Sequence, residues 1–408
     1  MIYDVAVVGA GPAGLAASLT AARHGAKVLL LEKQWRTGRR LAVTGGGRGN
    51  VGNLHLDVNF YNIEARPLLE AAADRLQADA LTSFLRSVGV LVFADEEGRL
   101  YPYTRQAQTV VRSMEDMLEE WQVTLELETE LVDFQRQSHG PFRLSTMRGE
   151  RLARTLVLAV GGTARPTLGG DATAFKLLQK KGYSLRPPKP ALVSLVTEKT
   201  LAKADGVRVI AEGTLRDRQG KIVKTSAGEY QITKNGLTGI AAMQLGRYVS
   251  GDRGPYELTL DFAPHMSADE VAKWLRHVIA LQPTRDGRFI LTSLLPQKLA
   301  VLLASGKKNA GTFADVAVPS LVQAVKETKL SVLGTNDWEQ AQVMSGGVTS
   351  EMLDTKTLES QIDEGLFMCG EMLDVDGETG GYNLHWAFMS GRTAGCEAAK
   401  KALSRRAD

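Results

Sequence analysis

Residues 2 to 33 constrain the fold of this chain more than any other stretch. A short apolar run, Val5 to Val8, leads directly into a glycine-rich turn, Gly9-Ala10-Gly11-Pro12-Ala13-Gly14. An alanine-rich segment with helical spacing follows, and a second apolar run, Val28 to Leu31, ends on Glu32. The order strand, glycine-rich turn, helix, strand and acid predicts a unit that binds a dinucleotide.

Each part of this unit has a physical role. Gly9 permits the tight turn, Gly11 lets the backbone approach a pyrophosphate, and Gly14 lets the helix pack closely on the strand. The free N–H groups and the positive dipole end of the helix favour phosphates. Glu32 follows the second strand, where its carboxylate can accept hydrogen bonds from ribose hydroxyls.

The competing interpretation of the same stretch is an export or membrane segment, because Val5 to Ala22 carries no charge. Glycines and a proline interrupt the run, which is at the short end of spanning length. A signal peptide also needs a positive start, whereas this chain has Asp4 there. The dinucleotide site is therefore the preferred interpretation.

Composition limits the function classes. A chain of 408 residues is long enough for two or three domains, and 44% hydrophobic with 23% charged residues is typical of a soluble protein. The net charge of +3 indicates no global field toward nucleic acid or an anionic membrane. Two cysteines without metal-ligand spacing predict no metal site and no structural disulfide, and favour a cytoplasmic location.

A second glycine-rich segment, Thr37 to Asn53, begins soon after Glu32. Consecutive glycines can expose backbone N–H groups as an anion-binding nest, and Arg48 adds a planar fork of donors. The alternative is a flexible surface loop. A cofactor loop is preferred because ligands of doubly wound folds lie at the carboxyl ends of strands, which this segment follows.

Periodicity predicts the elements that follow. Helices are expected at 67–88, 109–121 and 171–181, a hairpin at 90–103 turning at Glu97-Gly98, and strands at 123–128, 142–146 and 155–160. The last of these strands runs into Gly161-Gly162, which indicates a return to the parallel sheet. Arg186 to Pro190 is the strongest linker signal in the chain.

The region after this linker has a different pattern. Short β-rich runs occupy 191–261 around one helix at 238–249, helices are expected across 267–325, and strands at 329–333 and 340–345. We therefore predict an inserted domain at 188–342 with a helical subdomain at about 265–327. The first domain then comprises 1–187 and 343–408.

The last segment completes the first domain. Gly365 to Glu371 reads as a short strand, followed by an acidic loop, Gly380-Gly381 and a helix from about Tyr382. A long cofactor such as FAD needs this second contact set. Glu371 could accept from a ribityl hydroxyl, and Gly380-Gly381 with the helix N-terminus could stabilise negative charge on a reduced flavin. The competing interpretation is a silent loop and a docking helix.

These motifs resemble the aminoacetone-oxidase-like and bile-acid-reductase-like family of FAD-binding flavoproteins, within the NAD(P)/FAD-dependent oxidoreductases. The matching runs, in order, are Gly9–Gly14 with Glu32, Gly45–Asn50, Ala159–Gly162, Pro188–Leu195, Ser345–Val348 and Gly370–Asn383. The resemblance implies an α/β fold in which a three-layer, Rossmann-type FAD domain is interrupted by a β-barrel-like insertion with a small helical subdomain. It does not imply one reaction, because members of such families differ in substrate.

The chain departs from the family pattern twice. The family's glycine-rich loop usually reads GGGRCN, and here Gly49 occupies the cysteine position. A histidine-containing run in the inserted domain is replaced by Thr233 to Ile240, with Lys234 at the histidine position. A redox role for that cysteine is absent, and a histidine acid cannot be carried over.

The candidate cofactor-binding residues lie in both end segments and in the glycine-rich loops. They are Gly9, Gly11, Pro12, Ala13, Gly14, Glu32, Lys33, Arg40, Gly46, Gly47, Arg48, Asn50, Gly161, Gly370, Glu371, Gly380, Gly381, Tyr382 and Asn383. The catalytic residues are not identified by the sequence. Candidates for proton handling are Asp374, Asp376 and Tyr382, with Glu378 and His385 in the same segment.

The leading hypothesis is a FAD-dependent oxidoreductase acting on a small organic substrate, by amine oxidation or enone reduction, between the FAD domain and the insertion. A complete second GxGxxG unit is missing, and the inserted β-rich region has no such signature, so any NAD(P)H is expected to bind transiently, or electrons come from the substrate or another donor. The alternatives are a non-catalytic or redox-sensing FAD protein and a flavin-dependent RNA-modifying protein. The RNA alternative is supported only by an isoelectric point near 8.7 and an arginine cluster, so no nucleic-acid partner is expected, and the oligomeric state is open.

Overall fold

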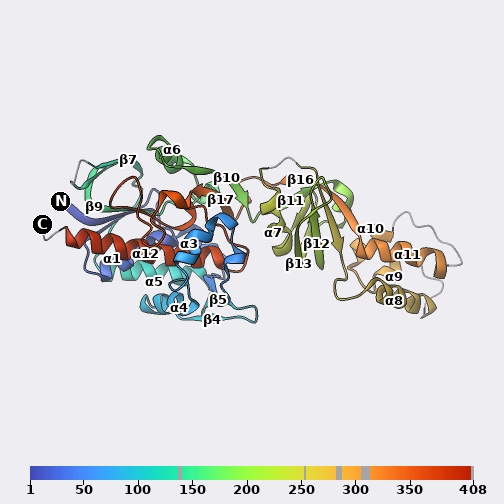
Figure 1. The fold of residues 1–408 in the computed structure, drawn as a ribbon. Coiled ribbons are helices and arrows are strands. Elements are labelled where there is room, and N and C mark those ends of the chain that lie inside the picture. The colour runs from blue at the N-terminus through green and yellow to red at the C-terminus, as the bar shows by residue number, and fades with distance from the viewer. Residues whose placement is uncertain (137–139, 252–253, 282–286, 305–312, 406–408) are drawn as a thin grey trace. The chain divides into compact units, whose positions relative to one another are not determined.

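The computed structural model describes residues 1–136, 140–251, 254–281, 287–304 and 313–405, and it divides into two compact units (Figure 1). Unit 1 comprises Met1–Lys189 with Val343–Asp408, and unit 2 comprises Pro190–Gln342. Unit 1 therefore contains both ends of the chain.

Unit 1 is built on a seven-stranded sheet in the order β6-β2-β1-β9-β8-β7, with β18 also paired to β9. The parallel strands are β1 (Ile2–Val8), β2 (Val28–Leu31), β6 (Thr124–Glu126), β9 (Gly149–Leu158) and β18 (Leu366–Met368). The antiparallel strands are β7 (Leu131–Arg136) and β8 (Phe142–Thr146). Every residue of β2 and β18 is buried, as expected for strands covered on both faces.

The α/β fold class is confirmed by this mixed sheet with a parallel core. The strand β7 is absent from the sequence-based expectation, and β9 begins at Gly149, earlier than the expected Thr155. Phe134 is the one buried residue of β7, so its apolar period is weak. β7 is a strand because it pairs with β8, and local sequence propensity alone does not indicate that pairing.

The first and last helices of unit 1 lie side by side in Figure 1. The helix α1 (Pro12–Arg23) follows β1, and α12 (Tyr382–Ser404) ends the described chain. Side chains at Gly391 and Gly395 would overlap the carbonyl oxygens of Ala13 and Ala17, respectively. The two glycines, one turn apart on α12, therefore allow the backbones of the two helices to touch.

Shorter elements complete unit 1. The helices are α2 (Arg39–Ala42), α3 (Arg66–Ala71), α4 (Ala78–Ser87), α5 (Ala107–Glu120) and α6 (Thr173–Lys180), with 3-10 turns η1 (Val58–Phe60), η2 (Ile63–Ala65), η3 (Pro166–Leu168), η5 (Ser350–Met352) and η6 (Gly370–Met372). A small antiparallel sheet contains β3 (Gly52–Asn53), β5 (Arg99–Pro102) and β4 (Val92–Ala94). The prediction of a single helix at 67–88 is wrong. The structure has two helices there, α3 and α4, separated by turns, and Arg75 in these turns donates to the Lys356 carbonyl.

The expected linker is an extended strand. β10 (Leu185–Ala191) pairs with β17 (Val343–Val348) in a two-stranded sheet, and the boundary between the units falls within β10. Pro187, Pro188 and Pro190 lack N–H groups, which a strand with a free side tolerates. The linker signal at Arg186 to Pro190 therefore lies at the boundary between the units, within a strand, because proline favours the extended backbone as well as breaking helices.

Unit 2 is a closed six-stranded barrel in the order β11-β14-β13-β12-β15-β16. The strands are β11 (Leu195–Thr197), β12 (Arg208–Arg216), β13 (Ile222–Thr233), β14 (Gly236–Thr238), β15 (Tyr256–Asp261) and β16 (Thr328–Thr335). Its neighbours are η4 (Lys199–Ala204) and the helix α7 (Ile240–Val249). The antiparallel pairing confirms the barrel-like insertion.

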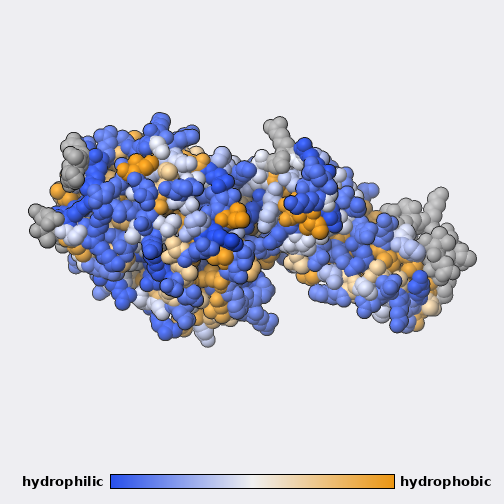
Figure 2. Space-filling view, in the orientation of Figure 1, coloured by the Kyte–Doolittle hydropathy of each residue, from blue (hydrophilic) through white to orange (hydrophobic). Residues whose placement is uncertain are grey.

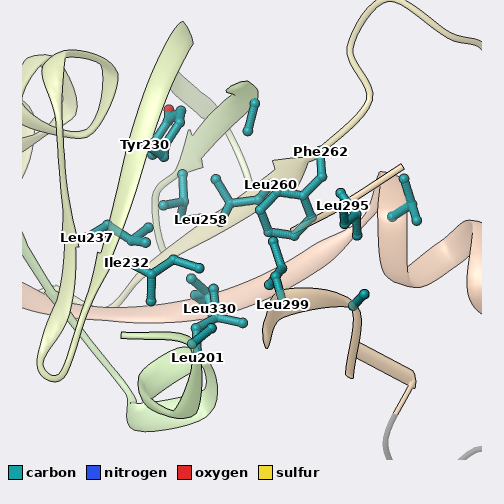
Figure 3. Packing of buried hydrophobic residues seen from close by; sticks show 14 of the residues in the cluster. Leu201, Tyr230, Ile232, Leu237, Leu258, Leu260, Phe262, Leu295, Leu299 and Leu330 are labelled. Atoms are coloured by element: carbon teal, nitrogen blue, oxygen red, sulfur yellow. The ribbon is translucent and has the colours of Figure 1, made fainter. Parts of the chain in front are cut away.

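One apolar cluster fills the barrel and continues to the helices beside it (Figure 3). Leu258 and Leu260 of β15 lie in it with Leu295 and Leu299 of the helical region. The helices are α8 (Ala268–Leu281), α9 (Gly287–Leu291), α10 (Gln297–Ala304) and α11 (Phe313–Lys326). The expected helical subdomain also spans 282–286 and 305–312, which lie outside the described residues.

Within the part of the chain that the structure describes, no helix is both long and apolar enough to cross a membrane. Hydrophilic residues cover most of the face drawn in Figure 2, with apolar residues in small separate groups.

Candidate functional site

The turn between β1 and α1 has the geometry of a phosphate-binding turn. Gly9 has φ +101°, and its N–H donates to the Leu31 carbonyl at 2.7 Å. A side chain at Gly14 would overlap the Gly9 carbonyl oxygen, so only glycine lets α1 approach so closely. A Cβ at Gly11, in contrast, would meet no protein atom within 4 Å. Open space therefore lies beside the backbone where a ligand phosphate is expected.

The N-terminus of α1 offers unpaired donors. The helix begins at Pro12, and neither a side-chain cap nor an acidic residue occupies its first turn. The first intrahelical bond runs from the Leu15 N–H to the Gly11 carbonyl at 2.9 Å. The amides of Ala13 and Gly14 come before that bond and lie at the positive end of the helix dipole, where a helix leaves its first amides without an intrahelical partner.

Glu32 is held beside this turn by two backbone amides. Its Oε2 accepts from the Ala10 N–H at 2.7 Å, and its Oε1 accepts from the Gln34 N–H at 2.8 Å. Each carboxylate oxygen retains a further lone pair, so Glu32 can still accept from a ribose hydroxyl. The next residue, Lys33, was also expected to bind the cofactor, and in the structure it forms an ion pair with Asp171. Burial lowers the pKa of the Lys33 amine, and the charges of Glu130 and Glu32 oppose that shift.

The second glycine-rich segment folds into tight turns. Gly46 (φ +66°) and Gly47 (φ +86°) have open space where a Cβ would lie. Gly49 has φ +79°, and a Cβ there would be 2.9 Å from the Cα of Ala107. The exposed Arg48 donates to the Gly45 carbonyl at 3.3 Å. Gly49 therefore replaces the family's cysteine at a position where this backbone has no room for a side chain.

Two asparagines tie this segment to the C-terminal part of the chain. With its amide oxygen facing Gly381, Asn50 accepts from the Gly381 N–H at 3.1 Å and donates to the Gly52 carbonyl at 2.9 Å. Asn53 is 2% exposed, and its amide donates to the Gly380 carbonyl at 3.0 Å. Sequence reasoning missed Asn53, although it ends the segment that contains Asn50.

The C-terminal segment supplies a second helix N-terminus. Gly380 (φ +127°) and Gly381 (φ +99°) precede α12, and a Cβ at Gly381 would overlap the Gly52 carbonyl oxygen. The first turn of α12, from Tyr382, has neither a side-chain cap nor an acidic residue. The structure therefore places the positive end of a helix dipole beside the glycine-rich segment.

Glu371 joins three parts of unit 1. Its carboxylate accepts from Arg40 at 2.5 and 2.9 Å, from the Gly162 N–H at 3.0 Å and from the Met344 N–H at 2.9 Å. These four bonds use about the full acceptor capacity of a carboxylate. The neighbouring Gly161 has φ +74°, and a Cβ there would be 3.3 Å from Arg40. Glu371 and Arg40 thus position the loops after β9 and β18.

Gly370 brings the C-terminal segment against the first helix. It has φ +77°, and a Cβ there would lie 2.8 Å from the Cβ of Ala13. Its N–H donates to the Ser390 hydroxyl at 3.0 Å, and its carbonyl accepts from the Trp386 indole at 3.2 Å. The loop after β18 is therefore locked between α1 and α12.

Aromatic residues surround the start of α12. The Tyr382 ring stacks on Phe60 at 4.8 Å, and the Tyr61 hydroxyl donates to the Tyr382 carbonyl at 3.0 Å. Burial raises the pKa of both tyrosine hydroxyls, so both stay protonated at neutral pH. Asn383 accepts from the Gly377 N–H and donates to its carbonyl, each at 2.8 Å, which fixes the loop before Gly380. Sequence reasoning missed Phe60 and Tyr61, which reach this loop only through folding.

The acidic candidates are buried in the same loop. Asp374 is 3% exposed and accepts from the Arg186 guanidinium at 2.6 Å and from the Asn62 amide at 3.1 Å. Burial raises its pKa, and Arg186 opposes the shift. Asp376 is 1% exposed, and its N–H donates to the Asn62 side chain at 2.9 Å. Glu378 follows, and its N–H donates to the Phe60 carbonyl at 2.8 Å.

His385 is fully buried one turn into α12. Burial lowers the pKa of its imidazole to about 4, with a smaller opposing effect from the backbone of Leu76 and Asn53. A neutral ring at physiological pH suits packing beneath the loop rather than proton transfer to a ligand.

The described residues therefore assemble one surface from both ends of unit 1. It combines two uncapped helix N-termini with open space at Gly11, Gly46 and Gly47. Two buried polar atoms, Arg36 Nε and Thr163 Oγ1, find no hydrogen-bond partner among the described residues. Within those residues, no group of three or more His, Cys, Asp or Glu side chains could hold a metal ion. The donor set fits a long ligand that carries phosphates.

Comparisons with known proteins identify the family. The model of the HI0933-like protein Rossmann domain matches residues 3–397. The 3-dehydro-bile acid delta(4,6)-reductase of Clostridium scindens is 32% identical, over 97% of this chain and 99% of that protein. The ribosomal RNA dihydrouridine synthase of Escherichia coli K12 is 26% identical, over 95% of this chain and 96% of that protein.

The fold has solved counterparts. A 3-ketosteroid-delta4-(5alpha)-dehydrogenase from Rhodococcus jostii RHA1, in complex with 4-androstene-3,17-dione, superposes with a TM-score of 0.51 at 17% identity. The match covers 97% of this chain and 96% of that one, and it supports the fold alone. With the family model and the full-length relatives, the sequence-based resemblance is confirmed: the chain belongs to the HI0933-like family of Rossmann flavoproteins.

Proposed function

We propose that this protein is a FAD-dependent reductase of a carbon–carbon double bond conjugated to a carbonyl group in a small organic substrate. The observation that carries the proposal is the end-to-end match, at 32% identity, to a reductase named for the delta(4,6) double bonds of a 3-dehydro-bile acid. The substrate class follows from that name, and the cofactor follows from the surface described above.

FAD fits the donors of unit 1. The amides of Gly11, Ala13 and Gly14 and the α1 dipole would hold the pyrophosphate, and Glu32 would accept from the adenosine ribose. Gly46, Gly47 and the N-terminus of α12 would face the flavin half. Bound flavin would supply the two-electron chemistry that reduces the double bond.

Residues of this chain would tune and complete that chemistry. The N-terminus of α12 stabilises negative charge on a reduced ring, because its dipole is already oriented. Of the candidates for proton handling, we propose Tyr382 as the proton donor. Its hydroxyl stays protonated at neutral pH, whereas Asp374 is bound by Arg186 and Asn62. We expect Tyr382→Phe to slow substrate reduction while the bound flavin keeps its absorption spectrum.

A second substrate class deserves the same test, because one relative acts on RNA. The name ribosomal RNA dihydrouridine synthase describes reduction of the uracil ring, whose double bond is also conjugated to a carbonyl. The same bond type therefore occurs in both relatives. The small substrate is proposed first because identity to the bile-acid reductase is higher, 32% against 26%.

The experiment uses protein loaded with FAD and reduced by light under anaerobic conditions. We expect a 3-oxo-4-ene steroid to reoxidise the flavin and a saturated 3-oxo steroid of the same skeleton to leave it reduced. Reoxidation by a ribosomal RNA transcript alone would replace the small substrate with RNA. Reoxidation by neither, or bleaching of the oxidised flavin by small amines, would contradict the proposal.

The electron donor is tested in the same apparatus. We propose that a nicotinamide, if it is the donor, reacts in a transient complex. Among the described residues, the GxGxxG run that stands between a strand and a helix is Gly9–Gly14, whereas Gly47–Gly52 leads into the strand β3. Mixing oxidised protein with NADH or NADPH should then give a reduction rate that rises linearly with concentration. A tight complex that saturates at low concentration would contradict this.

A further inference from the structure

A cysteine and a histidine meet where α1 and α12 cross near their C-terminal ends. Cys396 lies on α12 and is partly buried, and His24 ends α1 and is exposed. The Cys396 sulfur is 3.6 Å from the His24 Nε2, although the two residues are 372 positions apart in the chain. The packing of the first helix on the last one creates this pair.

The hydrogen bond of His24 Nδ1 determines whether the proton between Cys396 and His24 lies on the Cys396 sulfur or on His24 Nε2. His24 Nδ1 lies 2.9 Å from the Thr20 carbonyl oxygen, which can only accept a hydrogen bond. Nδ1 of the neutral ring is therefore the donor, and Nε2 presents its lone pair to the thiol. The Cys396 S–H donates to Nε2, which is the arrangement of a thiol beside its base.

Cationic side chains also face the sulfur. The pKa of the Lys400 amine is raised, mainly by its hydrogen bond to Glu397, and further by the charge of the Cys396 thiolate. Burial lowers the pKa of the Arg392 guanidinium, and the Cys396 charge opposes that shift. The charges of Lys400 and Arg392 therefore act on the Cys396 sulfur, with Glu397 as the neighbouring anion.

We propose that Cys396 is a modification site that takes up a small disulfide, with His24 as the base. The thiol proton moves to His24 Nε2, and the thiolate attacks one sulfur of the reagent. A Cys396–reagent disulfide forms as the reagent's own disulfide breaks, and the departing thiolate takes the proton from His24. The Cys396 sulfur is oxidised and the departing sulfur is reduced, so electrons balance.

This site is separate from the proposed cofactor surface. Cys396 lies fourteen residues past the start of α12 at Tyr382, which is about 21 Å along a helix. The other cysteine, Cys369, is fully buried, and burial raises its pKa. It is a control within the same molecule, because a buried neutral thiol does not attack a disulfide.

The test follows thiolate release from dithiobis(nitrobenzoate), an aromatic disulfide, with the FAD-loaded native protein at neutral pH. We expect one thiol to react rapidly in the native state and both to react after unfolding in guanidinium. Cys396→Ser should remove the rapid reaction without changing flavin absorbance. Peptide mass spectrometry should place the adduct on Cys396.

The role of His24 is tested by His24→Gln, which keeps a polar side chain but removes the base. We expect the rapid phase to slow about tenfold. His265→Gln, at an exposed histidine of unit 2, is the control and should react at the wild-type rate. Equal rates in the wild type and His24→Gln would overturn the role of His24. Slow reaction of both thiols in the native protein would overturn the site itself.

Discussion

Gly11 and Gly14, in the turn between β1 and α1, have different roles that substitutions can distinguish. Gly14 is required by the fold, because any side chain there overlaps the Gly9 carbonyl oxygen. Gly11 has an ordinary backbone (φ −78°) and open space beside it. The protein alone gives no reason for glycine at position 11, and a bound phosphate does.

We therefore expect Gly11→Ala to leave the thermal midpoint unchanged and to weaken FAD binding about tenfold or more, which is ~1.4 kcal/mol. Gly14→Ala should destabilise the fold by about 3 kcal/mol, because the helix must move away from the turn. Fluorescence titration with FAD and denaturant unfolding measure the two effects. Equal FAD affinity of Gly11→Ala and the wild type would contradict the proposal that a phosphate of FAD binds at this turn.

His385 makes stability depend on pH. Its pKa is lowered from 6.5 to about 4 in the fold, so below pH 6.5 the unfolded chain takes up a proton that the folded chain does not. The free energy of unfolding should therefore fall as pH decreases from 6.5 to 4, by about 3 kcal/mol at most, and the loss should be absent above pH 6.5.

His385→Gln should flatten this part of the stability profile, measured by denaturant unfolding across pH. His265→Gln should keep the wild-type slope. An unchanged slope in His385→Gln would show that the imidazole is protonated in the folded protein.

The sequence predicted which residues form the turn but not what several of them touch. Gly9, Gly11 and Gly14 follow from the spacing of the motif, although the contact of Gly9 with Ala159, far along the chain, does not. Tyr61 and Asn62 could not be found in that way, since their partners are Tyr382, Asp374 and Asp376. Those contacts arise only after the chain has folded back on itself.

The packing of α1 on α12 connects the two ends of the chain. Gly395 lies against the Ala17 carbonyl, and Gly391 lies against the Ala13 carbonyl in the first turn of α1. Any side chain at these positions separates the helices. The position of α1, and with it the phosphate-binding turn, therefore depends on residues near the C-terminus.

We expect Gly395→Ala to lower the free energy of unfolding by about 2 to 3 kcal/mol and to weaken FAD binding as well. Ser404→Ala, at an exposed position on the same helix, should change neither. Chemical unfolding and FAD titration of both variants provide the test. A neutral Gly395→Ala would mean that the helices do not pack as closely as described.

Elements with strong periodicity were predictable, and elements made by long-range pairing were not. The strand β2 and the helix α12 follow from apolar runs and glycine signals. The strand β7 depends on pairing with β8, and β10 depends on pairing with β17, far along the chain. Prolines in β10 also favoured a linker interpretation, because proline breaks helices and tolerates only one side of a ladder.

At the scale of the whole molecule, the N-terminal and C-terminal parts of the chain contact each other within unit 1. The turn after β1, the glycine-rich segment and the start of α12 are linked by contacts at Ala13, Asn50 and Gly381. The sequence indicated this closure, since the dinucleotide-binding start and the glycine pair at the far end were both expected to contact the same ligand. Substrate identity could not follow, because binding pockets depend on side chains from many segments.

Hydrogen exchange with and without FAD, read by mass spectrometry, tests the central claim most directly. The amides of Gly11, Ala13 and Gly14 and those at the start of α12 are expected to exchange freely when no ligand holds them. We predict that FAD protects both groups together and leaves α8 of unit 2 unchanged. Protection confined to the N-terminal turn, or none at either end, would contradict a single cofactor held by both ends of the chain.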